Sequence, residues 1–420
     1  MGEKIICLKP IYYDTFQCLA STCPDTCCRG WVIEIEPEMK EEWQTLTFPE
    51  NSRMQGASLA DYIDTEQWTN QEVRYQMRLN EEMHCYFLNE EKLCDVVCSF
   101  SHEQTPKICR SFPRQEICHR SLRSDSLSLR CPAVLDLLWS SDTFSLHCPD
   151  AQLSELSPSQ ALLEHFLSYA NHSVVSAPQL LFILFSLLRG LQDWIITESK
   201  EQNGKAASNK EYGQEFLSRD MVKKIAHHLS SAKSVCPSKA NNHQYFRQMT
   251  PKILRRWHDD LYDLMEAFFD SPIFGQECHD LFYASKDFLS LKEREQLKSF
   301  QDFLPYLEKW NKELSLLICE ELFTSVLTIE IEDIESILVR LQWLILQFVS
   351  ITYVLFLDWR KAGQLSYEKV RYRISRIFRI SERADIMKIH FFDHHFTNWM
   401  WSVDFAAELL GTSIFITVEQ

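Results

Sequence analysis

Four cysteines crowd one short stretch of the chain, FQCLASTCPDTCCRGW, which runs from Phe16 to Trp31. They are Cys18, Cys23, Cys27 and Cys28. Thiolates at this density suit zinc or an iron–sulfur cluster, because both take soft sulfur ligands. Pro24 and Gly30 predict a loop, and a loop lets several sulfurs turn toward one centre.

Disulfide bonds are the competing interpretation of these cysteines. Adjacent cysteines rarely bridge each other without strain, and disulfide frameworks belong to secreted chains. The first residues carry Glu3, Lys4 and Lys9 and no long apolar segment, so we expect no signal peptide. We therefore expect a cytoplasmic protein, and the reducing cytoplasm favours metal over disulfides.

A second set of cysteines follows farther along the chain. Cys85 and Cys94 flank the turn-like segment 89–92, which is a reasonable way to present metal ligands. Cys109 and Cys131 complete this set. All cysteines other than Cys236, Cys278 and Cys319 lie before residue 150. This distribution predicts a cysteine-rich metal-binding module over 1–150 and a helical domain over 151–420.

The rest of the pattern is mostly helical. Apolar periodicity predicts helices over 37–46, 160–171, 178–198, 214–231, 252–270, 291–325 and 332–360. Loops are expected near 199–213, 232–243 and 271–280. Short strands are expected in 5–13 and 31–36, and Pro10 argues against a central strand. The predicted fold is mainly α, with a small loop-rich cysteine module and a few short strands packed on a larger helical domain.

The segment 341–357, LQWLILQFVSITYVLFL, is apolar enough to suggest a membrane span. A spanning helix needs about 20 mostly apolar residues. This segment is shorter, and Gln342 and Gln347 lie inside it. We therefore expect a buried central helix and no membrane insertion.

Residues 366–388 form the most basic stretch of the chain, with arginines at 371, 373, 376, 379 and 383. The simpler interpretation is a solvated helix face paired with the acidic body of the protein, and we favour it. The alternative is an anion site for a cofactor carboxylate or an acidic partner. His390 and His394 follow at a helical i, i+4 spacing that can bind metal, but without a paired carboxylate ligand such a pair is more often structural, and we favour that interpretation.

Charge and motifs exclude several classes of protein. The formal net charge of −16 argues against nucleic acid and favours a lysine-rich partner. The chain has only 9 glycines, and no GxGxxG or GxxxxGK[ST] occurs, so a glycine-rich nucleotide loop is unsupported. No GxSxG or HExxH occurs either. Any chemistry is expected to centre on the cysteines.

Five segments together resemble a known family. They read FxCxxxxCxxxCCxGWxI from Phe16 to Ile33, CxFL from Cys85, LC at Leu93, CRxFPR from Cys109 and SLxCP from Ser128. This order is similar to that of the flagellin lysine N-methylase family, which belongs with the broader cysteine-cluster domains described as zinc- or iron-chelating. The resemblance covers residues 5–135 specifically.

The resemblance implies methyl transfer from S-adenosylmethionine to lysine ε-amino groups of flagellin, and a metal centre, most plausibly a 4Fe–4S cluster with zinc as the alternative. The implied metal ligands are Cys18, Cys23, Cys27, Cys28, Cys85, Cys94, Cys109 and Cys131. Eight thiols exceed the four that one such cluster needs, so either two centres exist or some thiols are structural. The loop reads CxxxxCxxxCC. It therefore does not support the radical CxxxCxxC signature.

The arginines beside Cys109 are candidates for cofactor binding. Arg110 and Arg114 could donate to a cofactor carboxylate, or could pair with Glu103 and Glu116. The residue that takes the proton from lysine is not predicted, although Glu82, His84 and Tyr86 lie beside the second cysteine set.

Two other functions fit the sequence. One is a non-catalytic iron–sulfur or zinc-binding scaffold or metal chaperone. The other is a structural zinc protein whose helical domain binds a partner. The length of the helical domain favours an enzyme over a chaperone, and binding of S-adenosylmethionine separates the two.

Overall fold

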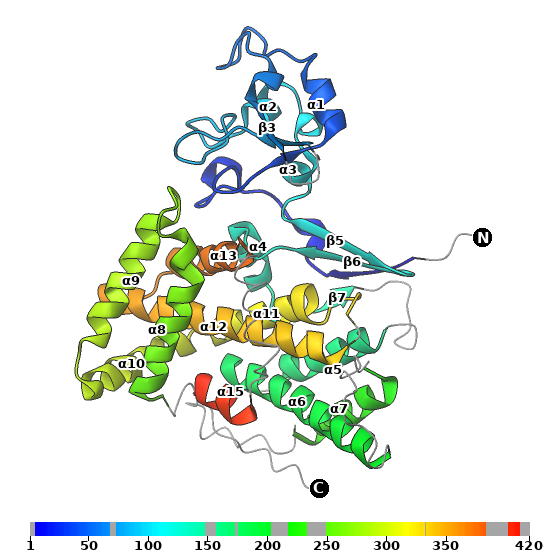
Figure 1. The fold of residues 1–420 in the computed structure, drawn as a ribbon, viewed down its shortest axis with the longest axis vertical. Helices are drawn as coiled ribbons and strands as arrows, with labels where there is room; N and C mark the ends of the chain where they lie inside the picture. Colours follow the sequence, from blue (N-terminus) through cyan, green and yellow to red (C-terminus); the bar gives the residue numbers. More distant parts are fainter. Residues whose placement is uncertain are drawn as a thin grey trace.

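A computed structural model describes residues 5–67, 73–147, 157–172, 175–202, 217–232, 249–331, 333–383 and 402–411. Figure 1 shows a smaller lobe of early sequence at one end of the long axis and a larger helical lobe below it. Helices dominate, and the strands are short and lie in two small sheets. The predicted mainly α fold is confirmed.

The smaller lobe has its own hydrophobic core, whose residues lie between 28 and 109, and we call it the cysteine lobe. Its antiparallel sheet has the order β2-β4-β3. The strands are β2 (Glu34–Ile35), β3 (Ile63–Gln67) and β4 (Val73–Met77), and the helices are α1 (Pro37–Trp43), α2 (Asp95–Ser99) and α3 (Lys107–Ser111). Trp43 and Phe87 are fully buried at the centre, with ring centroids 5.6 Å apart.

A four-stranded sheet connects the cysteine lobe to the helices (Figure 1), with the order β5-β6-β1-β7. The strands are β1 (Ile6–Pro10), β5 (Arg114–His119), β6 (Leu122–Leu127) and β7 (Leu146–His147). The expectation that Pro10 excludes a central strand is wrong, because β1 lies between β6 and β7. Pro10 is tolerated because it is the last residue of β1, beyond the pairing with β6, which ends at Leu8.

The larger lobe is built from helices. They are α4 (Pro132–Trp139), α5 (Pro158–His172), α6 (Ala177–Gln202), α7 (Arg219–Ala232), α8 (Pro251–Met265), α9 (Gly275–Leu289), α10 (Glu293–Glu308), α11 (Asn311–Glu321), α12 (Ile334–Ala362), α13 (Tyr367–Arg383) and α15 (Val403–Leu409). The main core joins these helices to β1 and β6. Residues well before 150 therefore pack with the helices, and the predicted boundary at 150 stays a prediction.

Two details of the helical prediction are wrong. The expected loop at 271–280 contains the start of α9 at Gly275. A Cβ at this position would lie 2.3 Å from the carbonyl oxygen of Phe269, so the close approach of backbone requires a glycine. The expected single helix over 291–325 is interrupted after Glu308 and continues as α11 and a π-helical turn at Leu322–Val326.

The long helix α12 runs through the middle of the helical lobe. The carboxylate of Asp333 accepts the N–H of Ser336 at 2.7 Å and caps its first turn, and Gly363 ends it with a left-handed φ of 73°. Among the described helices, α12 alone is long and apolar enough to cross a membrane, yet 83% of its most apolar window is buried inside the protein. The prediction of a buried central helix is confirmed.

Some sequence features fall where the structure gives no description. Cys148, Cys236, His390 and His394 lie outside the described residues, as does the segment 203–216 that includes most of the expected linker.

Candidate functional site in the cysteine lobe

We call residues 16–31 the cysteine loop. The last residues of this loop form backbone hydrogen bonds with the segment around Cys85, which belongs to the second cysteine set. The N–H of Cys85 donates to the carbonyl of Cys28 at 2.9 Å, and the N–H of Gly30 donates to the carbonyl of Met83 at 2.9 Å. Gly30 has a φ of 81°, a conformation that glycine adopts readily. These bonds place Cys28 beside Cys85, although the two are 57 positions apart in the sequence.

Two asparagines shape the turns that present Cys85 and Cys94. The side chain of Asn80 accepts the N–H of His84 at 2.8 Å, and the side chain of Asn89 accepts the N–H of Leu93 at 2.9 Å. Asparagine commonly organises turns in this way. An isolated β-bridge between Leu88 and Cys94 closes the second turn, so the predicted turn-like presentation of Cys85 and Cys94 is confirmed.

Four sulfurs accept hydrogen bonds from backbone N–H groups two residues ahead. They are Cys23 from Asp25, Cys85 from Phe87, Cys94 from Val96, and Cys131 from Ala133. Backbone donors aimed at sulfur stabilise the thiolate, which is the form that binds metal.

Cys85 lies in the core of the cysteine lobe, and Cys28, Cys94 and Cys109 pack against that core; we call these four thiols the inner group. Burial, followed by the nearby thiols, raises the pKa of Cys85, of Cys94 to about 11, and of Cys109. A hydrogen bond from Cys27 lowers the pKa of Cys28 to about 7. Without a cation, most of this group is protonated at neutral pH.

The remaining predicted ligands lie nearer the helical lobe. Cys23 interacts electrostatically with both Cys18 and Cys131, and we call these three the outer group. Burial raises the pKa of Cys23, and that of Cys131 to about 11. Cys27 adjoins the inner group through its hydrogen bond to Cys28. The structure thus brings the eight predicted ligands into two neighbouring groups.

The chemistry of the inner group suits a soft metal ion, since four thiols from distant segments share one buried core and two of them accept backbone donors. No disulfide joins the cysteines that the structure describes. However, no three described His, Cys, Asp or Glu side chains are gathered as closely as a bound metal ion requires. Metal binding therefore stays a prediction, and it would have to draw these thiols together.

A buried carboxylate in the cysteine loop holds the loop against α13. Asp25 is fully buried, and Arg29 pairs with its Oδ1 at 2.7 Å. From α13, Arg379 pairs with its Oδ2 at 2.8 Å, and Arg376 lies 3.6 Å from the same atom. We call Asp25 and these three arginines the Asp25 clamp.

Arg379 connects three segments that are remote in sequence: α13 itself, the cysteine loop and the residues before α4. Its guanidinium donates to the carbonyls of Asp25 at 2.7 Å, Thr26 at 3.1 Å and Arg130 at 3.0 Å. Thr26 precedes Cys27, and Arg130 precedes Cys131. Arg379 therefore fixes the backbone beside Cys27 and the backbone beside Cys131 to α13. The sequence analysis missed this role, for which the only signal was an aspartate among the cysteines.

The other described arginines of α13 also pair with carboxylates. Arg371 pairs with Asp136 at 2.6 Å, Arg373 with Asp358 at 2.6 Å, and Arg376 with Glu277 at 2.9 Å. The expected pairing with acidic residues is thus present. The expected solvation is wrong, because Arg373, Arg376 and Arg379 are buried between the helix and its neighbours.

A pocket of about 290 Å³ opens beside the outer group. Its lining residues from the cysteine loop are Cys23, Pro24, Thr26 and Arg29. Those from the following turn are His84, Leu88, Asn89, Glu90 and Lys92. This volume is near the lower end of the range for small-molecule sites, about 300–1,000 Å³. The pocket is therefore the candidate binding site of the lobe.

The two arginines predicted to bind a cofactor do not line this pocket. Arg110 donates to the carbonyl of Glu103 at 2.6 Å, and Arg114 lies over the ring of Phe16, 5.1 Å from its centroid. Arg110 thus contacts the backbone of Glu103, whereas the other proposed partner, Glu116, lies 3.9 Å from Arg123. Cofactor binding by Arg110 and Arg114 stays a prediction.

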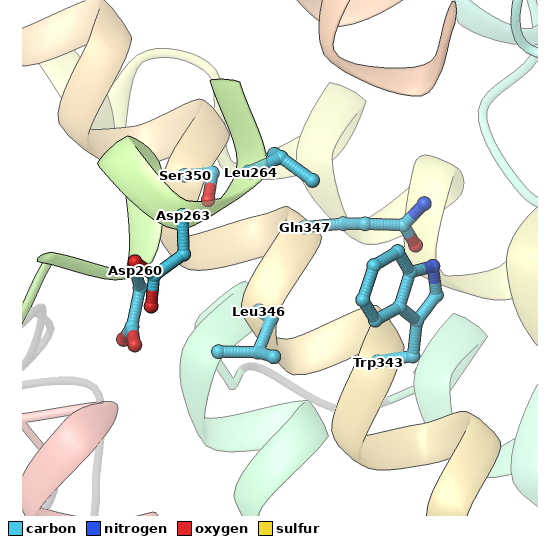
Figure 2. Close-up of a pocket in the computed structure, with 7 residues that line it drawn as sticks. All are labelled: Asp260, Asp263, Leu264, Trp343, Leu346, Gln347 and Ser350. Carbon is cyan, nitrogen blue, oxygen red and sulfur yellow. The ribbon is translucent and has the colours of Figure 1, made fainter. Parts of the chain in front are cut away.

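A second pocket lies between α8 and α12 in the helical lobe (Figure 2). Asp260, Asp263 and Trp343 are among its lining residues, and burial raises the pKa of Asp260 to about 7. Its volume of about 30 Å³ is the space of roughly one water molecule. It is therefore too small for a cofactor or a substrate side chain.

Comparison with known proteins finds proteins of similar sequence but no solved structure that could serve as a template. No protein-family model matches the chain, and no solved structure matches it. The chain is 28% identical over 202 residues to the lysine-N-methylases of Salmonella typhimurium (strain LT2) and Salmonella choleraesuis (strain SC-B67). Each alignment covers 44% of this chain and 47% of the relative.

A third relative is shorter. The chain is 25% identical over 136 residues to the flagellar biosynthetic protein FliU of Salmonella muenchen, covering 31% of this chain and 76% of that protein. The chain spans about half the length of the lysine-N-methylases it matches. Over that part of its length, this chain is similar to proteins named lysine-N-methylase and FliU, as its motifs predict.

Proposed function

We propose that this protein is an S-adenosylmethionine-dependent methyltransferase that acts on lysine ε-amino groups of flagellin in the cytoplasm. The observation that carries the proposal is the similarity to proteins named lysine-N-methylase, together with a pocket beside the predicted cysteine ligands. The net charge of −16 suits a substrate that presents lysines.

Methyl transfer requires little covalent chemistry from the protein itself. The lysine nitrogen attacks the methyl carbon of the sulfonium, a new N–C bond forms, the S–C bond breaks, and S-adenosylhomocysteine leaves. Lysine must first lose a proton, because its ordinary pKa is about 10.4. His84 lines the pocket and lies 3.6 Å from Glu82, so it is the best placed of the predicted proton acceptors. Tyr86 instead packs on Tyr62, with ring centroids 5.5 Å apart.

We further propose that the inner group holds a 4Fe–4S cluster, with zinc as the alternative. Cys28, Cys85, Cys94 and Cys109 would be its ligands, and the outer group with Cys27 would either hold a second centre or remain structural. A bound centre would supply a rigid anchor for the loops that line the pocket, since metal–ligand bonds stabilise loop-rich modules.

The test is transfer of an isotopically labelled methyl group from S-adenosylmethionine to purified flagellin. We expect label on flagellin lysines, detected by mass spectrometry. Cys85→Ala should lower the rate by about tenfold or more, as loss of metal-site groups commonly does. Cys118→Ala is the matched control, because this exposed cysteine of β5 lies outside both groups, and it should keep full activity.

Two results would contradict the proposal. Absence of label, with folded protein that binds no S-adenosylmethionine, would favour a non-catalytic metal-binding scaffold. Equal rates for Cys85→Ala and Cys118→Ala would remove the inner group from the activity.

A further inference from the structure

The pocket beside the outer group is unusually basic for this acidic chain. Arg29, His84 and Lys92 line it, and Glu90 is the one carboxylate among its lining residues. The protein as a whole carries a formal net charge of −16. A local reversal of charge in a concave site favours an anionic group in the ligand.

Arg29 is held in place rather than free to move. Its Nε and Nη2 donate to Oδ1 of Asp25 at 3.2 Å and 2.7 Å. Its Nη1 makes no hydrogen bond to another residue in the described ranges. A fixed guanidinium with one nitrogen still available suits a carboxylate, because the geometry of the donor is set before the ligand arrives.

Lys92 and Glu90 also line the pocket and belong to the turn that Asn89 organises. The N–H of Lys92 donates to the carbonyl of Asn89 at 3.0 Å, and Lys92 has a left-handed φ of 61°. Neither Lys92 nor Glu90 forms an ion pair with any side chain that the structure describes. The turn therefore presents one ammonium and one carboxylate to the pocket, both available to a ligand.

A ligand that can pair with both the positive groups and the carboxylate of the pocket is a zwitterion. An α-carboxylate would bind Arg29 and Lys92, and an α-ammonium would bind Glu90. A lysine side chain by itself does not match both signs, because it carries an ε-ammonium and no carboxylate. The pocket volume of about 290 Å³ is too small for a folded segment and large enough for an amino-acid group and its neighbouring atoms.

We propose that this pocket binds the amino-acid end of the methyl donor, with its carboxylate between Arg29 and Lys92 and its ammonium at Glu90. The inference rests on the proposed methyltransferase function, which supplies a donor with an α-amino-acid end. It deepens that function by assigning the donor a place beside Cys23, between the cysteine loop and the turn at 89–92.

The test compares two ligands by calorimetry on the full chain. S-adenosylhomocysteine carries the amino-acid end, and 5′-methylthioadenosine lacks it. Wild type should bind S-adenosylhomocysteine more tightly. Lys92→Gln should weaken that binding by about tenfold, the usual effect of losing one charge-assisted hydrogen bond, and should leave methylthioadenosine unaffected. Glu90→Gln should act in the same direction.

The control is Lys298→Gln, which changes an exposed lysine on α10, far from the cysteine lobe in the sequence. It should bind both ligands as wild type does. If Lys92→Gln and Glu90→Gln bind S-adenosylhomocysteine as tightly as wild type, the pocket assignment is wrong while the methyltransferase proposal stands. If wild type itself binds no S-adenosylhomocysteine, both proposals fail.

Discussion

Asp25→Ala is expected to destabilise the protein by about 3–5 kcal/mol, the usual effect of removing one partner from a buried ion pair. The carboxylate is fully buried between Arg29 and Arg379. Its loss leaves Arg379 buried with backbone carbonyls but without a counter-charge. The free energy of unfolding, measured by urea denaturation, reports the change.

Asp142→Ala is the matched control for this substitution. Asp142 pairs with Lys312 at 2.7 Å, but its side chain is 97% exposed. A surface pair of this kind contributes about 0–1 kcal/mol, so the control should be nearly neutral. Equal losses in Asp25→Ala and Asp142→Ala would show that the Asp25 clamp does not hold the cysteine loop to α13.

The second large effect concerns a carboxyl group between the four-stranded sheet and the helices. Glu320 of α11 is fully buried, and Tyr12, two residues after β1, donates a hydrogen bond to its Oε2. Its Oε1 has no hydrogen-bond partner in the described ranges. Burial, with a smaller contribution from Glu321, raises the pKa of Glu320 from 4.5 to about 8.

This shift makes the stability of the protein depend on pH. In the unfolded chain Glu320 ionises near pH 4.5, whereas in the folded protein it keeps its proton until about pH 8. Between these values the folded state binds more protons than the unfolded state, so its stability falls as pH rises. The contribution is fully present below the unfolded pKa and is lost as pH rises through the folded pKa. One pKa unit corresponds to about 1.4 kcal/mol, so the total loss is on the order of 3–5 kcal/mol.

Glu320→Gln removes the titration and keeps an acceptor for Tyr12. We expect the melting temperature of wild type to fall between pH 5 and pH 9 (an approximate range set by these pKa values), and that of Glu320→Gln to change less. Glu335→Gln, an exposed residue in the first turn of α12, should follow the wild-type curve. Parallel curves for wild type and Glu320→Gln would show that Glu320 is not the group responsible.

Much of the fold was predictable because apolar periodicity is local. The helices α5, α6, α8 and α12 follow from such patterns, and their observed bounds lie close to the predicted ones. Strands were harder to predict. The hairpin β3–β4 lies mostly at the surface, so its sequence shows little apolar alternation, and only two residues of the expected strand at 31–36 form β2.

The candidate site was predictable in its chemistry but not in its assembly. The spacing of Cys18, Cys23, Cys27 and Cys28 marks the loop as unusual, yet spacing does not say which thiols share a core. The contact between Arg379 and Asp25 spans 354 positions. No local pattern encodes such a contact, and the arginines of α13 resembled an ordinary solvated helix face until their partners were known.

The most direct test of the claim that distant cysteines form a metal centre is metal and sulfide analysis of anaerobically purified protein. We predict about four irons and four sulfides per chain for one cluster in the inner group. The double variant with Cys85→Ala and Cys94→Ala should lose this iron and sulfide. The double variant with Cys23→Ala and Cys131→Ala should retain both. A folded wild-type chain that holds neither iron nor zinc would contradict the account.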